Sequence, residues 1–297
     1  MEESKKQSVP FTEKLFGGIK MSWVKVVIFT VAAALFTASM LVIPVTEGTS
    51  FREIGVGVEC WVLFAVIIMT NCEKPLESAL KTFVFFLISQ PLIYLFQVPF
   101  SDLGFGLFMY YKWWFIVTLF TFPAAFVGWY IKKKNWLSLL ILSPVIVLLA
   151  YTGTLFMRET YSHFPFYLVS TLVCFGQIFI YLYAFFDDKI RQIIGLILAV
   201  GAVIVVFAVV PKIDATIVIA LPDTPVLSES AHAFVEDKKL CGVEVFNVEN
   251  ETFLRTRFVN YGSTVLHVTD NSESYTYSLS LEEDEQAPSI KLERTDK

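Results

Sequence analysis

Glu59 is an acidic side chain set inside an apolar block, where a carboxyl group can bind a proton or a cation. It lies within IGVGVECWVLF, residues 54–64. An ionisable group inside a membrane span costs roughly 2.5 to 3.5 kcal/mol unless it is paired or hydrated. Two functional interpretations follow: a proton or cation site, or an anchor in a cavity that opens outward. Two structural ones remain beside them: an ion pair with Arg52, Arg158 or Lys112, or a carboxylate that reaches the membrane interface.

Gln90 and Pro91 form a second candidate, near the middle of the apolar block 79–98. Proline removes a backbone donor and frees a carbonyl one turn earlier, and a glutamine side chain can supply the missing hydrogen bond. The pair predicts either a helix break that lines a substrate path, as in transporters, or a kink that packs against neighbouring helices.

The sequence contains no constellation typical of an enzyme or a metal site. The four cysteines, Cys60, Cys72, Cys174 and Cys241, have no C-x-x-C spacing, which argues against a zinc site. Polar residues of the short loops show no spacing that favours acid–base chemistry over ordinary solvated loops. We therefore expect no cofactor, no metal and no nucleic-acid partner.

The elements that position these residues are long apolar blocks. The chain is 55% hydrophobic and 17% charged, whereas a soluble domain carries about 25% charge. Blocks of about 20 apolar residues match a hydrocarbon core, and backbone in lipid must form helices or closed barrels. The sequence predicts seven transmembrane helices, near 24–44, 54–71, 79–98, 113–131, 136–156, 164–186 and 190–210.

Positive charge is distributed unequally over the short loops, which predicts the orientation in the membrane. Only Arg52, Lys112 and Arg158 lie on one side. The other side holds twelve: Lys5, Lys6, Lys14, Lys20, Lys25, Lys74, Lys81, Lys132, Lys133, Lys134, Lys189 and Arg191. Because Lys and Arg stay in the cytoplasm, we expect a cell-membrane protein with the N-terminus cytoplasmic and the C-terminus extracytoplasmic.

Aromatic and basic residues bracket the apolar block within 112–136, where they are predicted to anchor it in the bilayer. Amphipathic rings prefer the headgroup level. The predicted outer anchors are Trp113 and Trp114, and the predicted inner anchors are Trp129, Tyr130, Trp136, Lys132, Lys133 and Lys134.

The segment 1–23 precedes the first block. Phe11, Leu15, Phe16 and Ile19 are spaced to form one face of a short helix at the membrane interface. The alternative is a disordered tail, since Gly17 and Gly18 disfavour a helix.

After residue 210 the pattern changes to short, alternating, β-branched segments. Residues 212–297 hold sixteen Asp or Glu against eight Lys or Arg, a balance of 8 − 16 = −8. Five predicted strands, at 215–221, 242–248, 251–259, 263–270 and 274–281, suggest a small all-β sandwich over 211–282. STVLHVTDNSESYTYSLSL, residues 263–281, resembles the closing hairpin of bacterial Ig-like domains. The acidic segment 283–297 is predicted to be disordered.

These features favour a multi-pass membrane protein that binds, senses or scaffolds, presenting an acidic β domain outside the membrane. The expected partners are the lipid bilayer and an extracytoplasmic protein or envelope ligand. The alternative is a small-solute or ion transporter, with Glu59 and the break at Gln90–Pro91 lining its pathway.

Overall fold

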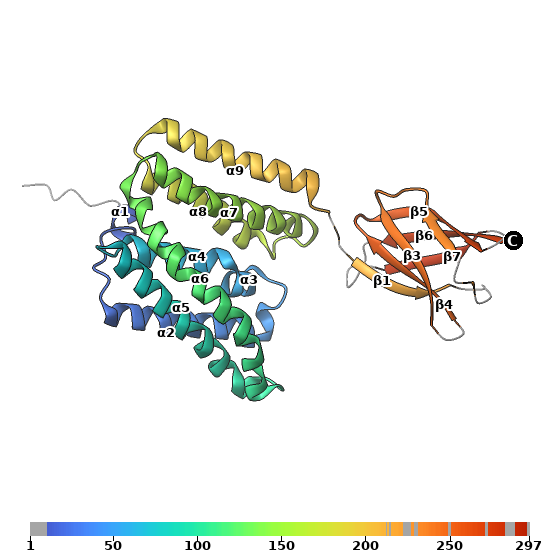
Figure 1. The fold of residues 1–297 in the computed structure, drawn as a ribbon, viewed down its shortest axis with the longest axis horizontal. Coiled ribbons are helices and arrows are strands. Elements are labelled where there is room, and N and C mark those ends of the chain that lie inside the picture. The colour runs from blue at the N-terminus through green and yellow to red at the C-terminus, as the bar shows by residue number, and fades with distance from the viewer. Residues whose placement is uncertain are drawn as a thin grey trace, which may run out of the picture. The chain divides into compact units, whose positions relative to one another are not determined.

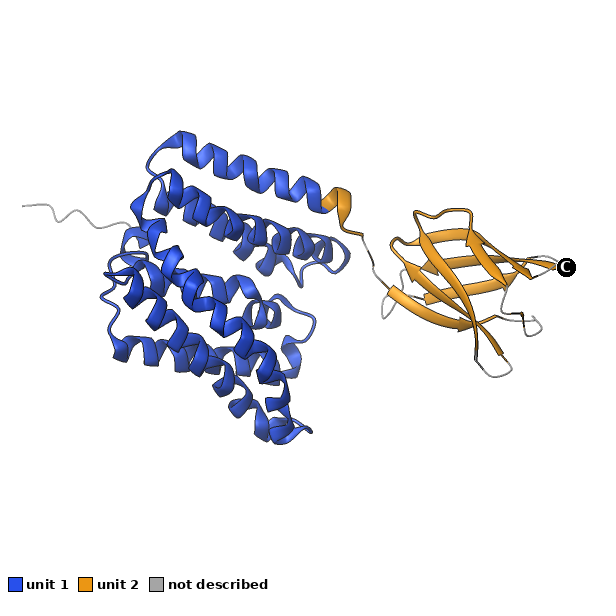
Figure 2. Ribbon diagram, viewed as in Figure 1, with its two compact units in different colours: residues 1–206 blue, residues 207–297 orange. Residues whose placement is uncertain are grey.

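The computed structural model describes residues 11–211, 213, 215–221, 227–228, 231–248, 251–270, 273–282 and 289–295. The chain forms two compact units, residues 1–206 and residues 207–297, drawn in blue and orange in Figure 2. The first is helical and the second is rich in β-strands, and each has its own hydrophobic core.

Helices make up the first unit (Figure 1). The α-helices are α1 (Phe11–Leu15), α2 (Trp23–Val42), α3 (Ser50–Val56), α4 (Val58–Thr70), α5 (Pro75–Gln97), α6 (Tyr111–Gly128), α7 (Trp136–Ser162), α8 (Leu168–Phe185) and α9 (Lys189–Val209). Short 3-10 helices are η1 (Pro44–Thr46), η2 (Val98–Phe100), η3 (Gly104–Tyr110) and η4 (Trp129–Lys133).

Six of the described helices are long and apolar enough to cross a membrane: α2, α5 with η2, α6 with η3 and η4, α7, α8 and α9. The bent pair α3–α4 passes the same test when both helices are taken together, which makes up to seven spans. The seven predicted blocks thus correspond to six helices and one bent pair, and the second block is the exception because its helix is broken at Gly57. By length and composition, these apolar helices indicate a membrane protein.

Local sequence explains where several of these helices begin. Ser22 caps α2, its hydroxyl accepting from the Lys25 amide at 3.3 Å. Asn135 and Ser138 form a capping box at the start of α7, with the Ser138 amide donating to Asn135 Oδ1 at 3.0 Å. Such caps satisfy amides that have no partner within the helix. Pro75 opens α5, where a missing amide proton costs nothing.

Hydrogen bonds tie together the connections at one end of the helical unit. Trp129 Nε1 donates to the Cys72 carbonyl at 2.9 Å, which joins η4 to the α4–α5 connection. Lys134 Nζ lies 3.0 Å from Asp187 Oδ1, which joins the η4–α7 connection to the α8–α9 connection. Arg191 donates to the Lys134 carbonyl at the same place. This is the end that holds the basic loops of the sequence.

The opposite end is tied by Ser50, the first residue of α3. Its hydroxyl donates to the Phe166 carbonyl at 2.7 Å and accepts from the Ser170 amide at 3.1 Å. The α2–α3 and α7–α8 connections therefore meet at this end, where Arg158 of α7 also donates to the Val206 carbonyl of α9 at 3.0 Å.

The N-terminal segment differs from its prediction as an interfacial helix. Residues 1–10 lie outside the described part, and α1 has only five residues. Phe11 is exposed, but Phe16 is buried, with its ring 5.7 Å from that of Tyr181 and 5.3 Å from that of Phe185. Phe16 therefore packs into the bundle, because it lies beyond the last residue of the short helix and is free to turn toward the core.

Seven described strands form the second unit. Three make a sheet in the order β1-β4-β3 and four make a sheet in the order β2-β5-β6-β7, all paired antiparallel. The strands are β1 (Ala215–Ala220), β2 (His232–Val235), β3 (Cys241–Val248), β4 (Glu251–Phe258), β5 (Gly262–Asp270), β6 (Glu273–Glu282) and β7 (Ser289–Arg294).

Side chains from both sheets share one buried cluster, which includes Leu254 and Phe258 from one sheet and Leu266, Tyr277 and Leu279 from the other. Their alternation along β4, β5 and β6 is the period of two that places every second residue inside. The five predicted strands match β1, β3, β4, β5 and β6.

The predicted disordered segment 283–297 is corrected by strand β7, which pairs with β6 from Tyr277–Arg294 to Glu282–Ser289. Ile290 and Leu292 pack against the core, while Lys291 forms an ion pair with Glu282 at 2.6 Å. The prediction of disorder followed the high acidic charge of this segment, although residues 289–294 have the alternating pattern of a strand. Residues 283–288 and 296–297 lie outside the described part.

Candidate functional site

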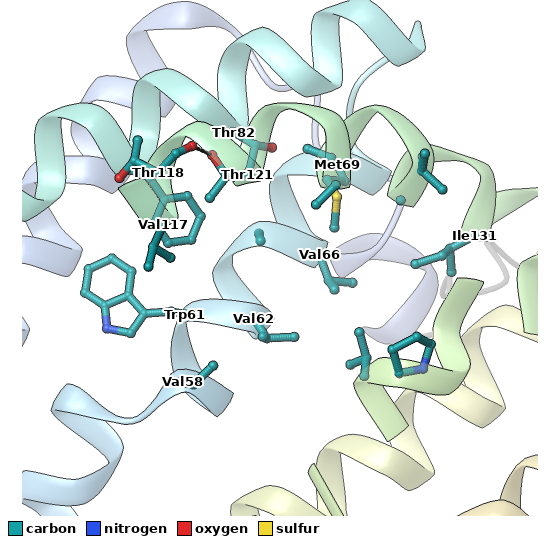
Figure 3. A pocket seen from close by; sticks show the side chains of 18 of the residues that line it. Val58, Trp61, Val62, Val66, Met69, Thr82, Val117, Thr118, Thr121 and Ile131 are labelled. Carbon is teal, nitrogen blue, oxygen red and sulfur yellow. Dashed lines mark hydrogen bonds between the residues drawn. The ribbon is translucent and has the colours of Figure 1, made fainter. Parts of the chain in front are cut away.

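A cavity of about 530 Å³ lies within the helical unit between α4, α5, α6 and α7. In Figure 3 the α4 side chains from Val58 to Met69 follow one another along it. The eleven residue-to-residue steps from Val58 to Met69 rise about 16 Å along the helix, so the α4 wall makes the cavity elongated. The other walls come from residues scattered between Thr82 on α5 and Val145 on α7.

Small side chains leave this space open. Ala65 on α4 and Ala124, Ala125 and Gly128 on α6 all line the cavity. Pro144 adds a ring without a donor on the α7 side. Most of the remaining lining is aliphatic or aromatic, which makes the cavity suited to an apolar ligand.

Four polar side chains line the same cavity, and one of them is unsatisfied. The hydroxyls of Thr118 and Thr121 donate to the backbone carbonyls of Trp114 and Thr118, at 2.9 and 2.6 Å. Thr82 is 1% exposed, and its hydroxyl oxygen has no hydrogen-bond partner in the described structure. Gln90 is buried beside this wall. Thr82 is thus a buried hydroxyl in the α5 wall, unpartnered among the described residues, and its oxygen is closed off from the open space of the cavity.

Gln90 lines the cavity, but α5 is not broken there. The helix runs from Pro75 to Gln97 with Pro91 inside it. Of the two alternatives predicted for Gln90–Pro91, the break is therefore wrong and the packed helix remains. Proline already has a helical φ and removes one backbone hydrogen bond, which a helix packed on its neighbours tolerates. The break lies instead at Gly57, where α3 and α4 meet at 49°.

Glu59 lies immediately after this break, in the first turn of α4. It is 1% exposed, and its Oε1 has no hydrogen-bond partner among the residues that the structure describes. Its carboxyl group folds back against Gly57, where a Cβ would overlap Oε1. Glu59 does not belong to the cavity lining, so the structure does not bring Glu59 and Gln90 together in one pocket.

The two arginines considered as partners of Glu59 have other partners. Arg52 Nη1 lies 3.7 Å from Glu47 Oε1, and Arg158 donates to the Val206 carbonyl. No cation lies within ion-pair distance of Glu59 in the described residues. The predicted ion pair is therefore absent, because both arginines extend toward the connections at the end of the bundle.

The predicted aromatic anchors divide into exposed and buried rings. Trp113, Trp114 and Trp136 are exposed, as a ring in contact with lipid headgroups must be. Trp129 is only 8% exposed and is fixed by its hydrogen bond to the Cys72 carbonyl. Trp129 therefore holds the α4–α5 connection in place. The sequence pattern alone cannot distinguish this structural role from contact with lipid headgroups.

The basic triplet also has structural contacts. Lys132 Nζ donates to the Cys72 carbonyl, and it lies 4.4 Å from the centroid of the Trp129 ring. Lys133 is exposed, with its ammonium 5.0 Å from the same ring. Lys134 has a left-handed backbone, φ 55°, and ends η4. Tyr130 is half-buried, with its ring 5.2 Å from that of Trp129.

The described residues contain no group of three or more His, Cys, Asp or Glu that could hold a metal ion. The cavity and the buried Glu59 are two features of the helical unit with the geometry of a binding site. The chain matches no protein-family model, no curated protein and no solved structure.

Proposed function

We propose that the protein is an integral membrane protein that binds a lipid acyl chain in the cavity between α4, α5, α6 and α7. The cavity itself is the observation that carries this proposal: about 530 Å³, elongated along α4, with apolar walls. A chain of methylene groups fits such a shape, and the surrounding bilayer supplies it.

Apolar walls alone do not give affinity in a membrane, since lipid tails are as apolar as the cavity. Selectivity must come from shape and from the polar groups that the ligand satisfies. The polar side chains in the walls of the cavity are Thr82, Gln90, Thr118 and Thr121.

The test is mass spectrometry of lipids that remain bound after purification in detergent. Ala65→Phe obstructs the cavity with a ring and should reduce retention of the bound lipid. Gly201→Leu on α9 is the matched control, because a Cβ at Gly201 meets nothing within 4 Å. Equal lipid retention by wild type, Ala65→Phe and Gly201→Leu would refute the proposal.

The proposed orientation places the basic end of the bundle in the cytoplasm and the β unit outside. The inequality of twelve against three basic residues supports it. Labelling of cysteines introduced in the loops, from each side of sealed vesicles, tests this orientation.

A docking role for the β unit is a second proposal, with an extracytoplasmic protein or envelope ligand as its partner. It is favoured by the separate core of this unit, and the β5–β6 hairpin resembles that of bacterial Ig-like domains. Residues 212–297 expressed alone should fold and retain an envelope component, and failure in both would remove this role.

The transporter alternative is favoured by the helix break at Gly57, since broken helices line many transport paths. Uptake of small solutes into proteoliposomes, compared between wild type and Glu59→Gln, tests it. Flux that is lost in a stable Glu59→Gln protein would support transport over lipid binding alone.

A further inference from the structure

Glu59 is a buried carboxyl group without a compensating charge. Glu53 of α3 acts on it electrostatically, and Glu59 itself acts on the thiols of Cys60 beside it and Cys174 of α8. All three are acids, so none can balance a negative charge on Glu59. An ionised carboxylate in such a place is strongly unfavourable.

The charged side chains of the other neighbouring helices are engaged elsewhere. On α5, Lys81 contacts Glu77 and lies at the end of the bundle near Met21. On α7, Arg158 donates to the Val206 carbonyl. Glu59 therefore has no counter-ion within the described structure.

Helix α8, which packs against α3, carries a second unsatisfied polar group. Cys174, Gln177 and Tyr181 recur at helical spacing and share one face. Glu59 interacts electrostatically with Cys174, and Cys60 with Tyr181. Gln177 lies between these two on α8. It is 4% exposed, its Oε1 accepts from the Tyr181 hydroxyl at 3.0 Å, and its Nε2 has no partner among the described residues.

Two carbonyl oxygens around the break already accept hydrogen bonds, which disfavours a cage for a metal cation. The Glu53 carbonyl accepts from the Gly57 amide at 2.6 Å, and the Gly55 carbonyl accepts from the Thr37 hydroxyl at 2.7 Å. Hard cations need about six oxygen ligands. A proton needs one, and the free Oε1 of Glu59 supplies it.

We propose that Glu59 is an exchangeable proton-binding site inside the bundle. In the conformation described here Oε1 carries the proton and the carboxylic acid is neutral. When the α3–α4 break opens to water, the O–H bond breaks, the proton passes to a water molecule and the carboxylate remains. The amides of the first turn of α4 then stabilise the negative charge. The site is separate from the lipid cavity, so it does not depend on the function proposed above.

Dicyclohexylcarbodiimide, an apolar reagent that adds to protonated carboxyl groups within membranes, tests the site in the full-length protein. Peptide mass spectrometry should find the adduct on Glu59 and should find none there in Glu59→Gln. Glu53→Gln is the matched control and should label at Glu59 as wild type does. Above the titration midpoint, labelling should fall up to about tenfold per pH unit. Sodium ions should not protect Glu59. Protection by sodium, or absence of an adduct on Glu59 at low pH, would overturn the proposal.

Infrared spectroscopy gives a second measurement that does not depend on access of the reagent. The difference spectrum of wild type minus Glu59→Gln should contain the carbonyl band of a neutral carboxylic acid, shifted by exchange into heavy water. Carboxylate bands in its place at neutral pH would show that Glu59 is ionised, and the proposal would fail.

Discussion

Gly57 is the residue on which the break between α3 and α4 depends. Its backbone has φ −64° and ψ 144°, which any residue adopts, so its requirement is one of space. A Cβ at this position would overlap the Glu59 carboxyl oxygen and would lie 2.6 Å from the Glu53 carbonyl oxygen. Gly57→Ala should therefore destabilise the helical unit by about 1 to 3 kcal/mol, measured as a lower thermal midpoint in detergent.

Gly176 on α8 is the control for this prediction, because a Cβ there meets nothing within 4 Å. Gly176→Ala should be neutral, or more stable by up to about 1 kcal/mol, from helix propensity. Equal midpoints for Gly57→Ala and wild type would show that the break adjusts freely to a methyl group.

Cys241 at the start of β3 is predicted to report on folding of the β unit. Burial, with a smaller effect of the Asp237 charge, raises the pKa of its thiol to about 11. At pH 8 its thiolate fraction is then about 100-fold lower than that of an ordinary thiol. Iodoacetamide should label Cys241 at least that much more slowly in native protein than in denaturant.

The same raised pKa predicts a loss of stability at alkaline pH. The folded state disfavours the Cys241 thiolate, so the contribution is complete below the ordinary thiol pKa and is lost as the pH rises toward 11. Cys241→Ser should reduce this alkaline loss. An equal loss in the variant would assign the effect to other groups.

At the scale of elements, Asn71 holds the N-terminal segment in the bundle. Its Oδ1 accepts from the Ile19 amide at 2.7 Å, and its Nδ2 donates to the Leu15 carbonyl at 2.6 Å. Asn71→Ala leaves these groups unsatisfied, at about 1 to 3 kcal/mol, and should release the segment that carries Phe16. Trypsin should then cleave faster after Lys14 and Lys20.

Asn71→Asp is the comparison for this element. It keeps an acceptor for the Ile19 amide but loses the donor for the Leu15 carbonyl, so the cleavage rate should fall between the other two. Cleavage at the wild-type rate in Asn71→Ala would show that packing of Phe16 alone retains the segment.

The sequence predicts an element well when the residues that determine it lie within the element itself, and poorly when they lie far away in the chain. Blocks of about 20 apolar residues and strands of alternating character carry their own signal; six blocks correspond to single long helices, and the five predicted strands match strands of the structure. Strand β2, with only four residues, is too short for a period of two to stand out. The turn of Phe16 into the core depends on contacts with Tyr181 and Phe185, residues far away in the chain.

The candidate site was predicted in part for the same reason. Glu59 and Gln90 are conspicuous because polar residues are rare in apolar blocks, and both are buried. Their partners and separation depend on how helices pack. The cavity is lined by small residues that lie between Ala65 and Pro144 in the chain. Their spacing in the sequence follows no pattern that would predict a shared cavity.

At the scale of the whole molecule, two separate cores predict two unfolding transitions. Within the β unit, hydrogen bonds from the Ser228 hydroxyl and amide hold the pKa of the Asp270 carboxyl below its usual range. A lowered pKa adds stability above the ordinary value of about 3.9, and this is lost as the pH falls through the folded value. The transition of the β unit should therefore move to lower temperature between pH 5 and about pH 3.

Ser228→Ala removes the hydroxyl that bonds Asp270, so the acid-induced shift of the β transition should become smaller. Ser274→Ala, an exposed position on β6, should keep the wild-type shift and serves as the control. Labelling of Cys241 during heating assigns the transition to the β unit, because that thiol lies in its core. A single transition in wild type would contradict the independent unfolding of the two units. The same acid-induced shift in Ser228→Ala as in wild type would contradict the role of this hydrogen bond.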